Sequence, residues 1–591
     1  MLNSPAVKEW ISWDQTHGTD ISKMSEPTLQ KIFKSRMAFG TAGLRSTMGP
    51  GPSQMNDLTI IQTSQGLLKY AENHFGLQQL QEKGIVVGYD ARYNSKNWAA
   101  ILANIAKSMG VKVKTFRKVT PTPWVAFGIR KFGAALGVMI TASHNPKNDN
   151  GYKVYWNNGS QIIPPHDKKI AASILENLKP WSDECWNKTL NFSSESLISD
   201  ILDENSAAYF EVLKRYVSFE KENQESDMKM VYTPVHGVGY DSCKHAILNV
   251  FKFKEENFSA TPEQKYPDPD FPTVEFPNPE EGKGVLSLSF KEADRIGANL
   301  VLASDPDADR LAVAQRPDAN SPWKVFTGNE CGALLGYWAF EMWRKRNPEP
   351  ASPKNCWMLS STVSSMICKA IAEKEGFNFE DTLTGFKWMG NSADRLINDN
   401  QQVLFAFEEA IGFMYGDQVL DKDGVSACAI FAEFCAQLDK ENKTLVQKLD
   451  EIYQKYGYHV AENSYFISHD KEKTNAMFKV LQDNYPKKLG NDYEIVGVRD
   501  LNKGFDSRQP DKKAVLPTQS SHMITFYFSN GATITLRTSG TEPKIKYYVE
   551  MVADSREKVL ADIEKMVNLM VKEWYQPEKY AHRGKQSKKG T

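Results

Sequence analysis

Short apolar segments that alternate with helical stretches are the feature that most restricts how the first third of this chain can fold. The segments GIVVGYD (84–90), VKVKTF (111–116) and ALGVMI (135–140) have the length and composition of buried strands. A helical stretch, NWAAILANIAKSMG (97–110), separates the first two, and a PTPW turn (121–124) followed by a helix separates the last two. Strands that alternate with helices form parallel sheets covered by helices on both faces. The pattern therefore predicts an α/β fold with a doubly wound sheet.

The six residues TASHNP (141–146) place a hydroxyl, an imidazole and a carboxamide together where the segment ALGVMI ends. Ser143 stands beside His144 and Asn145, and Pro146 stops the strand from continuing. Ligands bind at the carboxyl ends of strands in open α/β sheets, so we expect Ser143 to face a ligand. No G-x-S-x-G sequence surrounds this serine, which argues against a serine hydrolase.

Three aspartates at alternate positions, Asp305, Asp307 and Asp309, follow a second apolar segment, NLVLAS (299–304). A calcium loop would need a glycine next and a glutamate at its twelfth position, and arginine occupies both places. Three clustered carboxylates between predicted strands are unfavourable unless a cation shares them. We therefore expect a metal site, and the serine and aspartate loops together suggest metal-assisted phosphoryl transfer through a phosphoserine.

Composition argues against several classes of partner. The 72 Lys and Arg residues balance 73 Asp and Glu residues, which argues against nucleic acid or an anionic membrane as a partner. No run approaches the roughly 18 apolar residues that span a bilayer, and the first residues lack the apolar centre of a signal peptide. Seven cysteines without a C-x-x-C pair indicate reduced thiols. We expect a monomeric, cytoplasmic protein.

Changes of pattern along the 591 residues predict four domains, 1–215, 216–330, 331–456 and 457–591, because the chain is too long for one core. The proline-rich segment PDPDFPTVEFPNPEEGKG (267–284) is too long for a simple turn and is expected to be a functional loop. The last predicted domain has a different pattern of secondary structure. SHMITFYFSNGATITLRTSG (521–540) shows the alternation of a β-hairpin with a turn at Asn530 and Gly531, and a helix is predicted over 556–574.

Four further loops, each expected to follow an apolar strand, carry residues suited to sugar phosphates. FGTAGLR (39–45) combines flexible glycines with an arginine, and LTGFKWMG (383–390) holds a lysine between glycines. FEEAIGF (407–413) offers two carboxylates that could accept hydrogen bonds from sugar hydroxyls, or simply favour the start of a helix. RTSGTEPK (537–544) has the composition of a phosphate-binding nest, with a polar hairpin end as the alternative.

The motifs FGTAGLR, TASHNP, DPDADR, GFKWMG, FEEAIG and RTSGTEPK, in this order, resemble the α-D-phosphohexomutase superfamily over essentially the whole chain. The resemblance is closest to the eukaryotic phosphoglucomutase-2 type. It implies a heart-shaped, four-domain architecture around one central cleft. Three related α/β domains would carry the phosphoserine (1–215), the metal (216–330) and the sugar-binding loop (331–456). A smaller C-terminal α+β domain (457–591) with an antiparallel sheet would bind phosphate.

The resemblance also implies a phosphosugar mutase, an isomerase of carbohydrate and glucose metabolism that acts as an intramolecular phosphotransferase. It would interconvert the 1-phosphate and the 5- or 6-phosphate of ribose, deoxyribose and glucose through a phosphoserine and a bisphosphate intermediate. Its cofactors would be Mg²⁺ and glucose 1,6-bisphosphate, or a pentose bisphosphate, as activator. Small sugar phosphates would be its partners.

Carried over position by position, the resemblance assigns roles to residues of each loop. The catalytic residues would be Ser143, His144, Lys153 and Arg45. The metal ligands would be Ser143, Asp305, Asp307 and Asp309. The substrate would be bound by Arg45, Asn145, Arg310, Gly385, Lys387, Glu408, Lys422, Arg537, Ser539, Gly540 and Thr541.

One residue departs from the glucose-specific relatives, which have a serine two residues after the sugar-binding glutamate. This chain has Ala410, so a hydroxyl partner for a hexose is missing and the pentose or bisphosphate activities of the branch fit better. Two alternatives stay open. One is a glucose-1,6-bisphosphate synthase that uses 1,3-bisphosphoglycerate. The other is a catalytically silent sugar-phosphate-binding protein, against which the intact Ser143, Lys153 and three aspartates argue.

Overall fold

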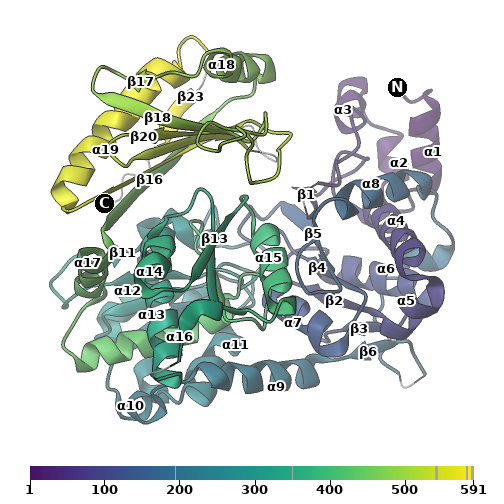
Figure 1. Cartoon of the computed structure of the whole chain (residues 1–591). Coiled ribbons are helices and arrows are strands. Elements are labelled where there is room, and N and C mark those ends of the chain that lie inside the picture. Colours follow the sequence, from purple (N-terminus) through teal and green to yellow (C-terminus); the bar gives the residue numbers. More distant parts are fainter. Residues whose placement is uncertain (41, 194, 349–350, 540–543, 581–582, 587–591) are drawn as a thin grey trace. The chain divides into compact units, whose positions relative to one another are not determined.

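The computed structural model describes the chain except for residues 41, 194, 349–350, 540–543, 581–582 and 587–591 (Figure 1). It divides into two compact units. The first comprises residues 1–331, 338–351 and 385–445, and the second comprises 332–337, 352–384 and 446–591. In the part of the chain that the structure describes, no helix is long and apolar enough to cross a membrane. All seven cysteines are buried free thiols, as predicted.

A six-stranded sheet organises the N-terminal part of the first unit and confirms the predicted α/β pattern. Its order is β1-β5-β4-β2-β3-β6, with β2, β3, β4 and β6 parallel and β5 antiparallel to both neighbours. The strands are β1 (Gly43–Thr47), β2 (Ile85–Tyr89), β3 (Val113–Thr115), β4 (Leu136–Ile140), β5 (Asp149–Trp156) and β6 (Ile198–Asp200). The helices are α1 (Pro5–Trp13), α2 (Gly18–Ile21), α3 (Glu26–Ile32), α4 (Asp57–Phe75), α5 (Leu77–Lys83), α6 (Ser95–Ser108), α7 (Thr122–Phe132), α8 (His166–Glu176) and α9 (Leu202–Leu213).

Two local predictions in this region were wrong. The FGTAGLR loop does not follow a strand. It leads from the segment after α3 into β1, which begins at Gly43 and includes Arg45. The PTPW residues do not form a separate turn, because α7 begins at Thr122 and Pro123 lies in its first turn. Proline is tolerated there because the first amide groups of a helix have no intrahelical partner.

The next sheet has the order β11-β10-β9-β7-β8. Strand β7 is parallel to β8 and β9, and β10 is antiparallel to β9 and β11. The strands are β7 (Met230–Thr233), β8 (Phe258–Ala260), β9 (Leu300–Ala303), β10 (Ala312–Gln315) and β11 (Lys324–Val325). The helices are α10 (Glu220–Glu225), α11 (Tyr240–His245), α12 (Lys283–Ile296) and α13 (Gly328–Arg346). The metal loop predicted at Asp305 thus follows β9.

The rest of the first unit contains the hairpin β14 (Gln402–Glu408) and β15 (Gly412–Tyr415), with α15 (Phe386–Asn398) and α16 (Gly424–Lys440). In the second unit, β12 (Cys356–Ser361) runs parallel to β13 (Asn378–Thr382) and α14 (Ile367–Glu375) connects them. Helix α17 (Leu445–Tyr456) precedes the C-terminal region. These elements continue the strand and helix alternation predicted up to residue 456.

The C-terminal region changes to an antiparallel sheet, as the sequence predicts. Its order is β17-β18-β20-β21-β22-β16-β23, with β19 beside β18. The strands are β16 (Tyr458–Ile467), β17 (Lys488–Leu489), β18 (Tyr493–Asp500), β19 (Phe505–Asp506), β20 (Met523–Phe528), β21 (Thr533–Thr538), β22 (Lys544–Ala553) and β23 (Arg583–Gln586). The helices are α18 (Lys471–Asp483) and α19 (Arg556–Met570). The predicted hairpin is β20-β21, and Gly531 in its turn has a φ of 83°.

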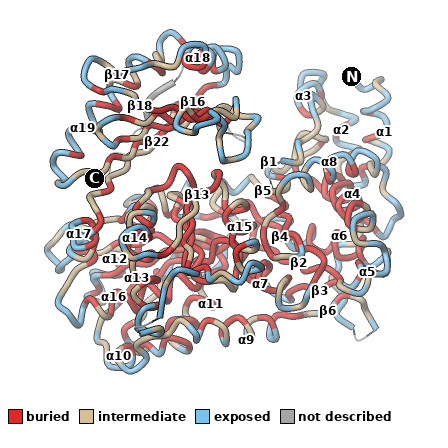
Figure 2. The backbone as a smooth tube through the Cα atoms, viewed as in Figure 1, coloured by how far each residue is buried: buried red, intermediate tan, exposed pale blue. Residues whose placement is uncertain are grey.

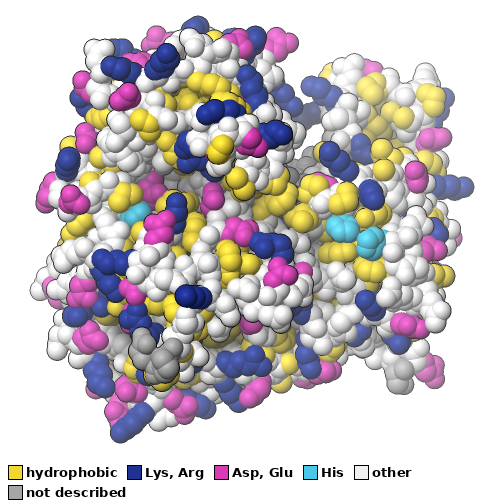
Figure 3. All heavy atoms as spheres, viewed as in Figure 1, with side chains coloured by type: hydrophobic (Ala, Val, Ile, Leu, Met, Phe, Trp, Pro, Cys, Tyr) yellow, Lys and Arg dark blue, Asp and Glu magenta, His cyan; other side chains and the backbone are white. Residues whose placement is uncertain are grey.

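Burial follows the sheets. Buried residues, red in Figure 2, are concentrated on the strands and on the helix faces that pack against them. In the N-terminal domain, β2, β4 and α6 contribute a continuous apolar cluster, and β20, β21, β22 and α19 contribute another in the C-terminal region. On the face drawn in Figure 3, basic and acidic side chains are intermixed, which agrees with the near-zero net charge.

Candidate active site

Ser143 lies at the carboxyl end of β4 in an unusual backbone conformation. Its φ is 53°, in the left-handed region that non-glycine residues rarely occupy. Its side chain is buried, and the hydroxyl donates a hydrogen bond to Asp305 Oδ2 at 2.6 Å. His144 Nδ1 is 3.3 Å from Ser143 Oγ. Strained conformations of this kind persist where the surroundings fix them, and they cluster at functional sites.

The surroundings that fix the serine loop include two residues that the sequence interpretation missed. Asp90 Oδ2 accepts a hydrogen bond from Thr141 Oγ1 at 2.7 Å, and that hydroxyl accepts one from the Ser143 amide at 2.9 Å. Arg92 is also buried, and its Nη2 donates to the carbonyls of Ser143 at 2.5 Å and Asn145 at 2.6 Å. Their position could have indicated a role, because Asp90 ends the predicted strand GIVVGYD and Arg92 follows two residues later.

Arg92 holds the loop through further carbonyls and is itself held in place. Its Nη1 donates to Pro146 O at 2.8 Å and to Asp149 O at 3.2 Å. Its guanidinium lies 5.0 Å from the ring centre of Phe271, which belongs to the proline-rich segment. One planar group therefore binds four backbone carbonyls around Ser143, an arrangement that a lysine ammonium cannot reproduce.

We expect Arg92→Lys to lower kcat by about tenfold to a hundredfold, because misplacing the serine by an ångström weakens transfer. The matched control is Arg130→Lys, since Arg130 also donates to two carbonyls, those of Asp417 and Gln418. Steady-state kinetics and thermal unfolding should be measured on both variants. Equal kcat losses in the two would show that Arg92 has no particular role in positioning the serine.

Asp305, Asp307 and Asp309 lie together where the sequence predicts a metal site. All three are fully buried, and one oxygen of each lies within 4.8 Å of the others. The Oδ1 atoms of Asp307 and Asp309 have no hydrogen-bond partner among the described residues. Burial and the two neighbouring carboxylates raise the pKa of Asp305 well above its usual range. Three buried carboxylates with free oxygen atoms fit a metal ion.

Two lysines contribute positive charge to the aspartate cluster. Lys153, on β5, places Nζ 2.6 Å from Asp307 Oδ2 and 3.1 Å from Asp309 Oδ2. Lys422 Nζ is 3.2 Å from Asp309 Oδ2. Burial alone would lower the pKa of both ammonium groups, but the carboxylates raise it above the usual value. Both side chains therefore remain protonated near neutral pH and can donate to an anionic ligand.

Arg310 joins the aspartate loop to the FEEAIGF loop. Its amide donates to Asp305 Oδ1 at 3.1 Å, and its Nη1 donates to Ala410 O at 2.6 Å. Its Nη2 is 3.6 Å from Glu408 Oε1, at the end of β14. Burial raises the pKa of Glu408, while Arg310 and Lys422 oppose that rise. Residues about 100 positions apart in the sequence thus share one charged cluster.

Arg45, His144 and Asn145 lie together beside the serine. Arg45 Nη1 donates to Asn145 Oδ1 at 3.1 Å, and Asn145 Nδ2 donates to Asp149 Oδ2 at 3.0 Å. Burial, with the charges of Arg310 and Arg45, holds the pKa of His144 well below its usual range. The imidazole is therefore neutral at physiological pH, so it contributes hydrogen bonding and not positive charge.

The predicted sugar-binding loop enters α15. Gly385 caps this helix with a φ of 102°, a conformation that favours glycine. Lys387 is buried in the first turn, and burial lowers its pKa. The ring centre of Phe386, between these two residues, lies 5.4 Å from Lys422 Nζ. This loop is thereby connected to the charged cluster.

The predicted phosphate nest belongs to the second compact unit. Arg537, on β21, donates from Nε and Nη2 to the hydroxyl of Tyr548 at 3.2 and 3.0 Å. The amide of Ser539 donates to Lys544 O at 2.9 Å. Gly540 and Thr541 lie outside the described residues. The role of this loop therefore remains a prediction from the sequence.

Thr122 is a further residue of the site that the sequence interpretation missed. Its hydroxyl donates to Asp307 Oδ2 at 2.6 Å, and its amide donates to Asp307 O at 2.9 Å. The first turn of α7 therefore orients one carboxylate of the aspartate cluster. The PTPW sequence contained this threonine, but nothing in the local pattern connected it with an aspartate 185 residues away.

Comparisons with known proteins agree with this geometry. Residues 36–180, 207–318 and 327–456 match the phosphoglucomutase/phosphomannomutase alpha/beta/alpha domains I, II and III. The human protein named phosphopentomutase is 50% identical over 97% of this chain and 96% of its own length. Human glucose 1,6-bisphosphate synthase is 46% identical over 97% and 94%. Saccharomyces cerevisiae phosphoribomutase is 39% identical over 93% and 92%.

A solved structure supports the same fold. The open form of pp63/parafusin, a phosphoglucomutase from Paramecium, superposes with a TM-score of 0.67 at 18% identity, covering 91% of this chain and 95% of that chain. The predicted architecture of three α/β domains and a C-terminal domain with an antiparallel sheet is confirmed. The chain is an enzyme and belongs to the phosphoglucomutase/phosphomannomutase family, within the α-D-phosphohexomutase superfamily.

Proposed function

We propose that this protein is a phosphosugar mutase in which Ser143 carries the transferring phosphoryl group. The proposed substrates are the 1-phosphates and the 5- or 6-phosphates of ribose, deoxyribose and glucose. The observation that carries the proposal is the 2.6 Å hydrogen bond from Ser143 Oγ to Asp305, inside a cluster of three aspartates and two lysines. The similarity to a phosphopentomutase and a phosphoribomutase supports the pentose substrates.

In the proposed reaction, phosphorylated Ser143 donates its phosphoryl group to a hydroxyl of the sugar phosphate and forms a bisphosphate. The bisphosphate turns over, and its other phosphoryl group returns to the serine oxygen. The transition state of such a transfer carries charge on its outer oxygens, so catalysis depends on positioning and electrostatic stabilisation. Lys153, Lys422 and Arg310 provide fixed positive charge for these oxygens. Arg92 and Thr141 hold the serine in place.

We propose Mg²⁺ as the ion of the aspartate site. Its ligands would be oxygen atoms of Asp305, Asp307 and Asp309, with the serine oxygen or its phosphate beside them. Oxygen ligands without nitrogen or sulfur favour a hard cation over zinc. When bound, the ion would neutralise charge that develops on the transferred phosphoryl group. Glucose 1,6-bisphosphate, or a pentose bisphosphate, would act as activator by phosphorylating Ser143.

The proposal is tested by measuring turnover of ribose 1-phosphate, glucose 1-phosphate and 1,3-bisphosphoglycerate side by side. We expect mutase turnover of both sugar phosphates, with the pentose favoured in kcat/KM. The alternative is a glucose-1,6-bisphosphate synthase, which the 46% identity to a protein of that name favours. Much faster use of 1,3-bisphosphoglycerate than of either sugar phosphate would establish that alternative. Binding of sugar phosphates without any turnover would identify a silent binding protein.

We expect Ala410→Ser to shift the preference towards glucose 1-phosphate by no more than about tenfold. The added hydroxyl offers one hydrogen bond, worth roughly 0.5–1.5 kcal/mol, which corresponds to a factor of about two to twelve. Arg310 already fixes the backbone here by donating to Ala410 O. The ratio of kcat/KM values for the two sugars is the measurement, and Ala561→Ser at an exposed position of α19 is the control. An unchanged ratio would mean that position 410 does not contact the sugar.

A further inference from the structure

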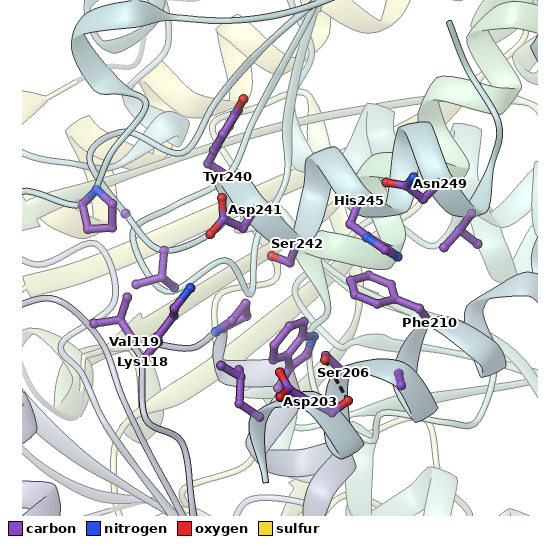
Figure 4. A pocket seen from close by; sticks show the side chains of 18 of the residues that line it. Lys118, Val119, Asp203, Ser206, Phe210, Tyr240, Asp241, Ser242, His245 and Asn249 are labelled. Atoms are coloured by element: carbon purple, nitrogen blue, oxygen red, sulfur yellow. Dashed lines mark hydrogen bonds between the residues drawn. The ribbon is translucent and has the colours of Figure 1, made fainter. Parts of the chain in front are cut away.

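A pocket of about 730 Å³ lies in the first unit, lined from one side by α9 and the segment before α7, and from the other by α11 and residues 249–252 and 265–267 (Figure 4). This volume lies within the range of small-molecule sites. In Figure 4, Phe210 and His245 face each other, Asp241 and Ser242 project from α11, and Lys118 enters from the opposite wall. None of its lining residues belongs to the aspartate and serine cluster described above.

The pocket has an excess of positive charge. Arg117 pairs with Asp203 at 2.7 Å, and Lys214 pairs with Glu211 at 2.6 Å, so these charges are balanced. The remaining charged lining residues are Lys118, Lys252, Lys265 and Asp241. Within the described part of the chain, none of these four forms a salt bridge. Three ammonium groups against one carboxylate favour an anionic ligand.

The pocket is also rich in rings. Trp124, Phe210, Tyr240, His245 and Tyr266 all line it. The rings of Phe210 and His245 are tilted by 33° with centres 4.2 Å apart, while Tyr266 is 65% exposed. The indole N–H of Trp124 is buried and has no hydrogen-bond partner among the described residues. Aromatic walls beside cationic groups suit a ligand that has both a flat ring and a phosphate.

We propose that this pocket binds a small organic anion with a flat ring, the chemistry of a nucleoside monophosphate, and that its occupancy changes metal binding at the aspartate loop. Two pocket walls contact that loop directly. The amide of the lining residue Val238 donates to Pro306 O at 2.8 Å, and Thr122, between two lining residues, holds Asp307. At Gly237, a Cβ would lie only 2.2 Å from Pro306 Cα. A shift of either wall therefore displaces the metal loop.

The test uses the full-length protein and adenosine monophosphate as the probe, with binding measured by calorimetry. We expect one site per chain with a Kd below about 1 mM, which excess glucose 1,6-bisphosphate does not displace. Adenosine and inorganic phosphate should each bind at least about tenfold more weakly, because each lacks half of the contacts. Binding is measured without turnover, so its failure is distinct from failure of the proposed mutase activity, although the metal effect rests on that function.

Variants locate the site. Lys118→Gln and Lys252→Gln should each weaken binding of the nucleotide by about tenfold, since each removes a charged partner of the phosphate. Lys244→Gln is the matched control, because Lys244 lies on α11 outside the pocket and pairs with Glu255 at 2.7 Å. It should leave the Kd unchanged. Circular dichroism and thermal unfolding should show that all three variants are folded.

Several results would overturn the inference. The proposed site would be contradicted if the probe did not bind at its solubility limit or if glucose 1,6-bisphosphate displaced it. Equal Kd values for the two lysine variants and the parent would contradict it as well. If inorganic phosphate bound as tightly as the nucleotide, the proposal that the ligand carries a flat ring would be wrong. A Kd for Mg²⁺ that is the same with and without saturating nucleotide would remove the effect on the metal loop, because coupling between two sites is reciprocal.

Discussion

Replacement of Ser143 by alanine is expected to lower mutase turnover by about 10⁴-fold or more, as loss of a covalent nucleophile does. The serine oxygen is the attacking atom in one direction and the phosphoryl donor in the other, and no other hydroxyl occupies its position 2.6 Å from Asp305 among the described residues. After incubation with glucose 1,6-bisphosphate, intact-mass measurement should show one added phosphate on the parent protein. The Ser143→Ala protein should show none.

The fold should survive this substitution. It removes one hydrogen bond to a carboxylate and should cost about 1–3 kcal/mol in the free energy of unfolding. Ser259→Ala is the matched control, because Ser259 Oγ donates to the carboxylate of Glu292 away from the site. That variant should lose comparable stability and keep its turnover. Phosphate labelling of the Ser143→Ala protein to the level of the parent would show that another residue carries the phosphoryl group.

Much of the site could be predicted because each loop is marked locally. In each case polar residues come at the end of an apolar strand: TASHNP after β4, the aspartates after β9 and Glu408 at the end of β14. These three strands belong to three different sheets, so the local patterns mark each loop but do not by themselves predict that the loops meet. The structure brings the first two within one hydrogen bond.

The missed parts depend on contacts that no local pattern contains. Arg92 acts on carbonyls that only the folded loop brings together, and Thr122 meets Asp307 across 185 residues of sequence. Strand β6 was missed because the region around it is polar, and it is recognisable as a strand only by its pairing with β3. The FGTAGLR loop was wrongly placed after a strand. Its composition indicates an anion site but does not show whether the loop precedes or follows a strand.

Removal of divalent metal is expected to lower turnover by about 10³-fold, and addition of Mg²⁺ should restore it. Stabilisation of a phosphoryl transition state by a bound ion is worth several kcal/mol, and about 4 kcal/mol corresponds to this factor. The structure gives the reason, since the Oδ1 atoms of Asp307 and Asp309 are buried in the aspartate cluster and have no hydrogen-bond partner among the described residues. Lys153 and Lys422 alone supply positive charge at fixed positions and cannot coordinate the phosphate.

The Asp307→Asn variant assigns the metal effect to this site. It removes one of three charged ligands, so the affinity for Mg²⁺ measured by calorimetry should fall by at least about tenfold. Lys153 retains Asp309 at 3.1 Å as a partner, and removing one of three neighbouring carboxylates relieves repulsion, so we expect only a small change in stability. The control is Asp227→Asn, whose side chain is 91% exposed and pairs with Lys254 at the surface. Full turnover in metal-free buffer, or equal Mg²⁺ affinities for the two variants, would exclude a catalytic metal at the aspartate loop.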